Sequence, residues 1–215
     1  MCTHPAAYQE NPNPHVPPRH ASRPGERWAY NNWDFNALGT ILEQASGLGP
    51  FEAFAEWIAR PLHMQDYDPK HCEYAWNPLS RHPAYDFRIS ARDLARVGLL
   101  FLRRGRWENS QVVPEGWVDD STRPLSPATG VHEALAAAYG YMWWVGRPDT
   151  LGGREFYAAF GGQGHALVVV PQLDLVLVHR NYGFAAVPKW TQVFPTLREV
   201  ADLSSHLVRD HHDPQ

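Results

Sequence analysis

The sequence predicts an α+β fold in which helices flank an antiparallel sheet. Apolar residues recur with helical spacing in several stretches between residues 34 and 120. Three short runs rich in β-branched and aromatic residues then follow one another between residues 155 and 178, and a last helical stretch follows them. Helices and strands that are segregated along a chain in this way are typical of the α+β class.

The first two helices are expected between residues 34 and 61. The first begins at Asp34, which can act as N-cap, and stops at Gly47. Its apolar side consists of residues at helical spacing: Phe35, Leu38, Ile41, Leu42 and Ala45. A second helix is expected from Pro50, because proline suits the first helical turn, and Pro61 ends it.

The most regular helix is expected directly after Ser90. Ser90-Ala91-Arg92-Asp93 resembles a capping box in which Asp replaces the usual Glu or Gln. Gly105 closes this helix, and its buried stripe consists of Leu94, Val97 and Phe101. The charged side is interpreted as solvated surface and carries Arg92, Arg96, Arg103 and Arg104. A short helix is expected around residues 114–120.

The strands are expected at residues 155–160, 165–170 and 173–178, the last two joined by a tight turn at Pro171-Gln172. The last two runs are almost continuously apolar, which predicts that both faces of the sheet are covered. The aromatic run Tyr139–Val145 is interpreted as a strand or a pocket wall. A final helix is expected from about Pro195 to Val208, with an inner face formed by Leu197, Val200, Leu203, Leu207 and Val208.

Composition excludes several classes of function. The formal net charge of −4 does not match the basic surface that nucleic acid requires. Cys2 and Cys72 are too few for a disulfide framework, although one bridge stays open. No apolar run approaches the ~20 residues that cross a bilayer. Residues 1–27 have no apolar core of a signal peptide, and localisation stays open because a segment upstream could carry a signal.

Several local strings occur in the order found in a known family. They are Pro24-Gly25, Tyr30-Asn31-Asn32, Leu38-Gly39, Pro61-Leu62-His63-Met64, Ser90-Ala91-Arg92-Asp93-Leu94-Ala95-Arg96, Gly105-Arg106-Trp107, Tyr139-Gly140-Tyr141, Trp143-Trp144, Gly161-Gly162-Gln163 and Asp174-Leu175-Val176. Together they resemble the serine β-lactamase superfamily, with its class C β-lactamases, penicillin-binding proteins and related esterases. The resemblance implies one β-lactamase/transpeptidase-like domain over residues 1–215, incomplete at its N-terminus: residues 24–150 are mainly helix and loop, and residues 151–208 hold the sheet strands and the C-terminal helix.

The resemblance implies a nucleophilic serine in a Ser-x-x-Lys motif, and this chain has none. Its two lysines are Lys70, which Tyr67 precedes by three positions, and Lys189, which Ala186 precedes likewise. In the family the serine attacks a carbonyl carbon while the lysine helps to remove its proton. The sequence therefore predicts that the nucleophile segment is absent from these 215 residues.

The family's Tyr-x-Asn motif is matched by Tyr30 and Asn32. The resemblance implies that Tyr30 relays protons and is catalytic, and that Asn32 helps to hold the substrate. A free phenol has a pKa of about 10, and a neighbouring ammonium favours its ionised form. The missing lysine therefore matters for Tyr30 as well. The alternative interpretation is that Tyr30 only packs beneath Pro24-Gly25.

A third family motif, a Lys- or His-led triplet that ends in Gly, is matched by Phe160-Gly161-Gly162 with Gln163 after it. Phe160 departs from the pattern, because a phenyl ring cannot donate to a substrate carboxylate. The glycines suit close approach of substrate to backbone N–H groups, and the four residues are predicted to bind substrate. A tight turn at the strand end is the alternative for the glycines, and His165 is interpreted as a strand histidine.

Two hypotheses about function remain. In the first, the full-length protein is a serine hydrolase that acts on an ester, amide or β-lactam through an acyl-enzyme. In the second, this chain is a non-catalytic, truncated or pseudo-enzyme domain that at most binds ligand. No cofactor and no metal are expected, since the candidates His4, His15, His20, His63, His71, Cys72, His211 and His212 match no ligand spacing. The expected partners are a small-molecule or peptide-like substrate and, through one unpaired sheet edge beside a partly covered last helix, a second chain.

Overall fold

The computed structural model describes residues 28–181 except 77, 79 and 131, residues 190–210, and the separate residues Arg23 and Glu26. Contacts within the chain divide it into two compact units. The first comprises Met1–Ser90 with Thr129–Val131, and the second comprises Ala91–Ala128 with His132–Gln215. One incomplete domain over the whole chain stays a prediction. The Pro24-Gly25 string lies outside the described residues.

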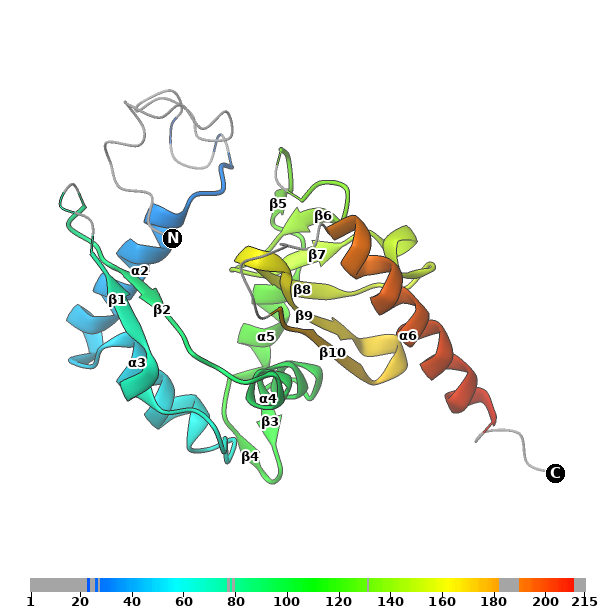
Figure 1. The fold of residues 1–215 in the computed structure, drawn as a ribbon, viewed down its shortest axis with the longest axis horizontal. Helices are drawn as coiled ribbons and strands as arrows, with labels where there is room; N and C mark the ends of the chain where they lie inside the picture. Colours follow the sequence, from blue (N-terminus) through cyan, green and yellow to red (C-terminus); the bar gives the residue numbers. More distant parts are fainter. Residues whose placement is uncertain are drawn as a thin grey trace. The chain divides into compact units, whose positions relative to one another are not determined.

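The first unit combines helices with one small hairpin (Figure 1). Strands β1 and β2 pair antiparallel, with Tyr74 opposite Tyr85. The elements are α2 (Asn32–Ser46), α3 (Pro50–Phe54), a π-helical turn (Ala55–Ala59), a 3-10 turn (Pro69–His71), β1 (Glu73–Ala75) and β2 (Ala84–Asp86). The predicted helix start at Pro50 is confirmed.

Helix α2 begins earlier than predicted. Its N-cap is Asn31 rather than Asp34, and the Asn31 side-chain oxygen accepts a hydrogen bond of 3.1 Å from the Asp34 N–H. The Asn31 amide donates in return to the Asp34 carboxylate at 2.7 Å. Asp34 therefore lies in the first turn, where its negative charge interacts favourably with the helix dipole. The predicted stop is confirmed, because Gly47 has φ 75° and its N–H donates to the Glu43 carbonyl.

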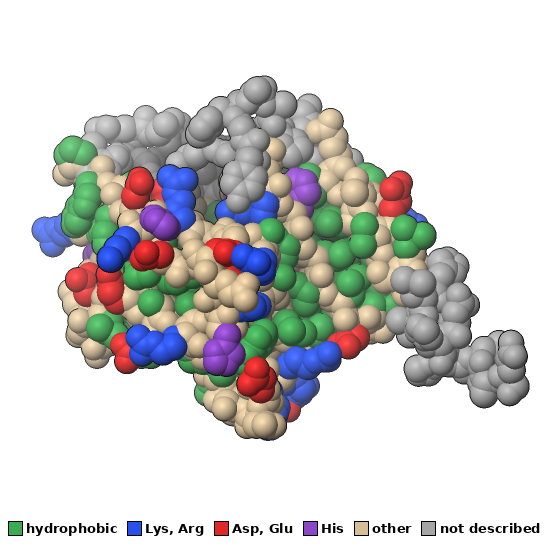
Figure 2. Space-filling model, turned by 60° about the horizontal axis from the view of Figure 1, so that its bottom comes forward, with side chains coloured by type: hydrophobic (Ala, Val, Ile, Leu, Met, Phe, Trp, Pro, Cys, Tyr) green, Lys and Arg blue, Asp and Glu red, His purple; other side chains and the backbone are tan. Residues whose placement is uncertain are grey.

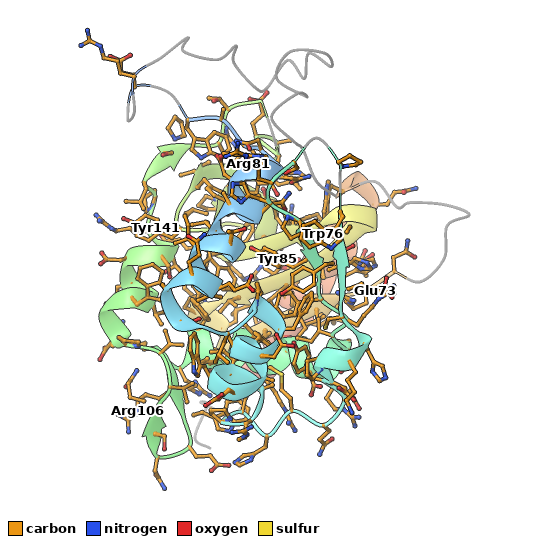
Figure 3. All side chains as sticks on the ribbon, turned by 90° about the vertical axis from the view of Figure 1, so that its left-hand side faces the viewer. Glu73, Trp76, Arg81, Tyr85, Arg106 and Tyr141 are labelled. Atoms are coloured by element: carbon orange, nitrogen blue, oxygen red, sulfur yellow. The ribbon has the colours of Figure 1, made fainter. Side chains whose placement is uncertain are left out.

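The apolar side predicted for α2 is not the side through which the helix packs. Leu38 and Ile41 are 47% and 57% exposed, and the helix packs instead through the side that carries Gly39. A Cβ at Gly39 would overlap the Tyr85 ring, so only glycine allows β2 to lie this close to α2 (Figure 3). The Tyr85 hydroxyl donates to the Phe35 carbonyl at 2.8 Å, which fastens the hairpin to the helix.

The second unit is built on a six-stranded antiparallel sheet with the order β10-β9-β8-β7-β6-β5 (Figure 1). The strands are β5 (Ser126–Pro127), β6 (Ala136–Tyr139), β7 (Trp144–Gly146), β8 (Tyr157–Gly161), β9 (His165–Val170) and β10 (Leu175–His179). The three predicted strands are β8, β9 and β10. Strand β5 was not predicted, and β6 and β7 were indicated only by the aromatic run at 139–145, because segments of two to four residues are too short to show alternation.

Helices cover both faces of this sheet, as the apolar strands predicted. Helix α4 (Ala91–Leu102) packs on β9 and β10 beside Val176 and Val178, and α6 (Trp190–Asp210) packs on the face that carries Leu177. Gly98 permits the close approach of α4, because a Cβ there would lie 2.5 Å from a Val176 methyl group. The remaining elements are α5 (Glu115–Thr122), a hairpin of β3 (Arg106–Trp107) and β4 (Ser110–Gln111), and 3-10 turns at Pro148–Leu151, Gly162–Gly164 and Pro171–Leu173.

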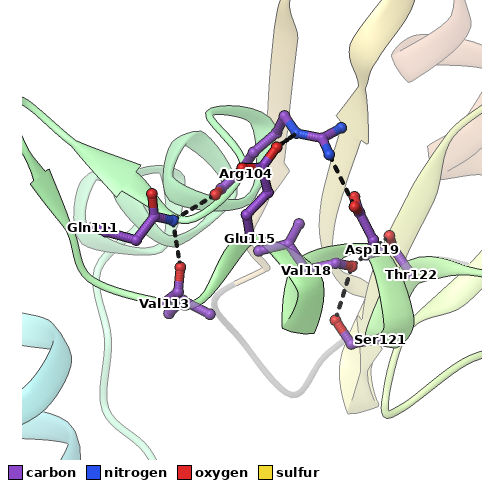
Figure 4. A network of polar contacts seen from close by, with 8 residues as sticks. All are labelled: Arg104, Gln111, Val113, Glu115, Val118, Asp119, Ser121 and Thr122. Carbon is purple, nitrogen blue, oxygen red and sulfur yellow. Dashed lines mark hydrogen bonds and ion pairs between the residues drawn. The ribbon is translucent and has the colours of Figure 1, made fainter.

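The segment after α4 is held by a polar network (Figure 4). The Arg104 guanidinium donates to Glu115 at 2.5 Å and to Asp119 at 2.9 Å, both on α5. The Gln111 amide bridges the Arg104 and Val113 carbonyls. Because these ion pairs are more than half exposed, water screens the charges, and the pairs orient α5 more than they stabilise it. The predicted short helix is present as α5 and starts at Glu115.

The last helix differs from the prediction in its start and in its inner face. It begins at Trp190, so Pro195 lies inside the helix rather than at its first turn. Leu197 is buried as predicted, whereas Val200 and Leu203 are 39% and 66% exposed. The expectation of a partly covered helix is confirmed. No helix among the described residues is both long and apolar enough to span a membrane.

The aromatic run at 139–145 is two short strands and their turn. Trp143 and Trp144 are buried, with 7% and 2% of their surface exposed, so the interpretation as pocket walls is wrong for these two residues. Trp143 packs against Phe101 of α4, and Trp144 packs against Tyr139 on the neighbouring strand. They belong to the core.

Candidate functional site

The predicted site residues fall in both units. Tyr30 and Asn32 lie in the first unit, whereas Phe160 to Gln163 lie in the second. The structure shows the burial and the contacts of each of these residues within its own unit.

Tyr30 lies just before α2 and is half-buried. Its ring meets Phe35 edge-on at a centroid distance of 5.2 Å and lies 6.4 Å from the Trp28 ring. Burial raises the pKa of the Tyr30 phenol above its ordinary value of 10. At neutral pH this group is therefore a neutral phenol. It can donate a proton, and it needs a nearby positive charge before it can accept one.

Asn32 is the first residue of α2 and is half-buried. The residue between it and Tyr30, Asn31, is buried and is engaged with Asp34 through both ends of its amide. The cap thus fixes the start of the helix directly after Tyr30. It positions the backbone from which the Tyr30 and Asn32 side chains extend. Asparagine, the residue at the middle position of this Tyr-x-Asn string, is among the preferred N-cap residues.

Gly161 and Gly162 lie where β8 ends, and both are exposed. Gly161 pairs with His165 across the β8–β9 connection, and a Cβ on Gly161 would lie 3.2 Å from the His165 Cβ. A Cβ on Gly162 would meet no atom within 4 Å. Gly161 has an extended backbone with φ −109°, so glycine provides space here rather than relief of strain. The two peptide groups are open to a ligand; the side chain of Gln163 lies outside the described residues.

The Phe160 ring is part of an aromatic cluster in the core. It lies 4.8 Å from Trp190, 5.2 Å from His132, 5.7 Å from Phe194 and 6.0 Å from Trp144, measured between ring centroids. The side chain therefore anchors the end of β8. Its place among the substrate-binding residues stays a prediction.

Two histidines brace the turn after the glycines. The His165 Nδ1 accepts a hydrogen bond of 3.2 Å from the Asn181 N–H, and β9 begins at His165, as predicted for a strand histidine. His179 on β10 lies 2.8 Å from the Gly164 carbonyl through its Nδ1. Because a carbonyl only accepts, this nitrogen of His179 carries the proton. Sequence reasoning missed His179, since only the pairing of β9 with β10 brings it beside residue 164.

Comparison with known proteins places this arrangement in a family. The family model described as Beta-lactamase matches residues 2–187. The chain belongs to the Beta-lactamase family. Comparison with curated proteins finds no match. The family membership confirms the resemblance that the ordered strings indicated.

Solved structures share the β-lactamase/transpeptidase-like fold. A protein from Bacillus anthracis described as a 6-aminohexanoate-dimer hydrolase has a TM-score of 0.64 and 21% identity, over 87% of this chain and 46% of its own. An octameric penicillin-binding protein homologue from Pyrococcus abyssi has a TM-score of 0.59 and 18% identity, over 84% and 44%. A β-lactamase from Mycobacterium bovis has a TM-score of 0.54 and 20% identity, over 84% and 66%. This chain thus spans less than half of the first two.

Among the described residues of this Beta-lactamase-family chain, no cluster of three or more His, Cys, Asp or Glu side chains could hold a metal ion. His63, His71 and Cys72 are described and form no such group. The other candidate ligands, at positions 4, 15, 20, 211 and 212, lie outside the described residues.

Acidification is expected to destabilise the second unit through His132. Burial among aromatic rings lowers the pKa of this imidazole below 6.5. As pH falls below about 6.5, this imidazole binds a proton in the unfolded chain but not in the folded chain. The free energy of unfolding therefore falls by up to ~1.4 kcal/mol per pH unit. The stability is fully present above pH 6.5. Urea unfolding at several pH values measures it.

His132→Asn is expected to flatten this pH dependence. Asparagine tolerates the φ of 52° at this position. His63→Asn is the matched control, because His63 is exposed and has the same φ. An unchanged pH profile in His132→Asn would show that other groups, such as His165, carry the acid sensitivity.

Proposed function

We propose that this chain supplies the tyrosine–asparagine and glycine-strand parts of a serine hydrolase site, which acts on an ester, amide or β-lactam through an acyl-enzyme. The attacking serine and its lysine would come from a Ser-x-x-Lys motif outside the 215 residues. The observation that carries the proposal is the open backbone of Gly161 and Gly162 at a strand end in a Beta-lactamase-family chain. The expected substrate is a small or peptide-like molecule.

The proposed chemistry assigns a role to each group. The serine oxygen attacks the carbonyl carbon, its proton passes to the Tyr30–lysine pair, and the leaving group takes that proton when the C–N or C–O bond breaks. Backbone N–H groups near Gly161 and Gly162 stabilise the charge on the carbonyl oxygen. Burial raises the pKa of Tyr30, so the ammonium of the lysine must lower it for Tyr30 to become the phenolate that accepts the serine proton.

The second candidate function is ligand binding without catalysis. Two observations favour it for this polypeptide by itself: the sequence has no Ser-x-x-Lys, and burial beside Phe35 and Trp28 raises the pKa of the Tyr30 phenol, which keeps it neutral. In this case the glycine strand end would hold a carbonyl compound through hydrogen bonds alone.

Covalent labelling separates the two. The 215-residue chain is expected to remain unlabelled by a fluorophosphonate or a reporter penicillin. A longer polypeptide that includes an in-frame Ser-x-x-Lys upstream is expected to be labelled stoichiometrically. In that polypeptide Tyr30→Phe is expected to slow labelling at least ~100-fold, the usual size of a lost proton relay. Equal labelling rates with and without the Tyr30 hydroxyl would refute its role.

Self-association through a sheet edge belongs to the same proposal about partners. It is supported by the edge position of β10 among the described strands and by the relative from Pyrococcus abyssi, which is described as octameric.

A further inference from the structure

The turn between β8 and β9 has little to hold it from within. It is a 3-10 turn over Gly162–Gly164, and Gly161, which precedes it, has no side chain to cap it. Gly164 has φ 82°, and glycine loses more conformational freedom on folding than any other residue. Bonds from outside the turn therefore decide whether the peptide groups of Gly161 and Gly162 keep one position.

Two histidine contacts tie this turn to the end of β10, the strand next to β9 in the sheet (Figure 1). The His179 side chain on β10 donates through Nδ1 to the Gly164 carbonyl at 2.8 Å. The Asn181 N–H, just after β10, donates to Nδ1 of His165 at 3.2 Å, and His165 pairs with Gly161 at the end of β8. Together these two contacts form a histidine clamp on the turn.

The two imidazoles use the same nitrogen in opposite ways. Nδ1 of His179 carries a proton, because the carbonyl oxygen that it contacts only accepts. Nδ1 of His165 carries none, because it accepts from an N–H, so the neutral ring has its proton on Nε2. Protonation therefore has different effects on the two contacts. His179 gains a proton on Nε2 and still donates, whereas His165 gains one on Nδ1, where it faces the Asn181 N–H as a second donor.

The surroundings of His165 oppose a positive charge on its ring. Burial lowers the pKa of this imidazole below 6.5, and the nearby Arg180 and His179 lower it further. In the described part of the chain, these are the charged or titratable groups that act on it, and its neighbour on β8 is Gly161, which has no side chain. The contact with Asn181 is therefore kept at neutral pH and is lost as pH falls through the lowered pKa.

We propose that His165 and His179 are positioning residues for the glycine strand end, and that acid opens the His165 half of the histidine clamp. The turn then loses one of its two outside bonds, and the peptide groups of Gly161 and Gly162 no longer keep one position. The consequence for the reaction rests on the proposed function, in which these groups bind the carbonyl oxygen of the substrate. Acid then slows acylation at a pH where the second unit is still folded.

The test needs a signal from single residues. The chain has twelve histidines, and Figure 2 shows histidines that lie singly at the surface among acidic and basic side chains. An exposed imidazole titrates at about pH 6.5, so a property of the whole molecule changes for several reasons at once. NMR of the 215-residue chain reports separately on each glycine amide and on both nitrogens of each imidazole.

The wild-type chain is expected to show the clamp directly. The imidazole signals are expected to place the proton on Nδ1 in His179 and on Nε2 in neutral His165. The amide signals of Gly161 and Gly162 are expected to move with pH, with a midpoint below 6.5. The Asn181 amide is expected to lose its protection from hydrogen exchange over the same pH range.

Asparagine and glutamine provide matched variants, because the Asn amide reaches the position of Nδ1 and the Gln amide extends one bond further. H165N keeps an acceptor for Asn181 and cannot be protonated, so the glycine titration is expected to disappear while the protection remains. H179N keeps a donor for Gly164 and is expected to retain the wild-type protection of the Asn181 amide. H179Q is expected to lower that protection about tenfold, the size of one lost hydrogen bond.

Two controls separate this effect from other titrations. His132 packs beside Phe160, and burial lowers its pKa as well, so H132N must leave the glycine titration in place. H63N, at an exposed histidine of the first unit, is expected to change nothing. Far-UV circular dichroism verifies that each variant is folded. The proposal is overturned if the glycine titration persists in H165N or vanishes in H132N, or if H179Q behaves like H179N.

The longer polypeptide with an upstream Ser-x-x-Lys tests the consequence for the reaction. As pH falls through the glycine midpoint, fluorophosphonate labelling of the wild type is expected to become about tenfold or more slower than that of H165N. Equal rates at every pH would overturn the positioning role of His165. Absence of labelling in both would overturn the proposed function instead, and the glycine signals of the 215-residue chain would still decide whether the clamp exists.

Discussion

Replacing Gly105 by alanine is expected to destabilise the second unit by roughly 3 kcal/mol or more. Gly105 has φ 80°, which a residue with a Cβ adopts only at a cost. The added Cβ would also overlap the Val113 carbonyl oxygen and lie 2.9 Å from the Gln111 amide nitrogen. The Gly105 carbonyl accepts from the N–H groups of Val112 and Val113, so the backbone cannot move away without losing the contact between α4 and the β3–β4 hairpin.

Gly153→Ala is the matched control for this change. Gly153 has φ 89°, yet a Cβ there would meet nothing within 4 Å. It is expected to cost only about 1 kcal/mol, the price of the backbone conformation alone. Urea unfolding followed by circular dichroism measures both. Equal losses in the two variants would show that backbone strain, and not the contact with Val113, explains the glycine at position 105.

Trp144→Ala is expected to cost about 3–5 kcal/mol, the usual range for a buried tryptophan. The side chain is 2% exposed, and its ring packs edge-on against Tyr139 at 4.7 Å and against His132 at 4.9 Å. It also stacks on Phe160 at 6.0 Å. The cavity would therefore loosen the end of β8, and hydrogen exchange at Gly161 is expected to accelerate along with the loss of stability.

Trp117→Ala provides the comparison at the surface. Trp117 is 52% exposed and stacks on Tyr141 at 5.4 Å. Its removal is expected to cost about 1 kcal/mol or less and to leave exchange at Gly161 unchanged. A small loss in Trp144→Ala would mean that the core around Phe160 can collapse into the space. Faster exchange in both variants would mean that position 161 responds to general instability.

The candidate site could be predicted from sequence only as separate strings. Tyr30-Asn31-Asn32 and Phe160-Gly161-Gly162 were recognisable because each is a local pattern at the end of a regular element. Their surroundings were not. Asn31 rather than Asp34 caps α2, the Phe160 ring lies in the core, and His179 holds the Gly164 carbonyl. The first of these depends on which of two possible residues caps the helix. The other two depend on contacts with residues distant in the chain.

By itself the sequence determined the class of fold, the helices that start after residue 90 and at Pro50, and the paired strands β9 and β10. These elements depend on periodicity, caps and turns within a few residues, so a local pattern is enough to specify them. Only the tertiary structure decided which side of a helix is buried. Leu38 and Ile41 of α2 are exposed while Gly39 faces Tyr85, and Val200 and Leu203 of α6 are exposed while Leu197 is buried. Which side of a helix is buried depends on the surface against which the helix packs. In α2 that side is the one where a glycine leaves room for an aromatic ring, although larger apolar side chains lie on another side.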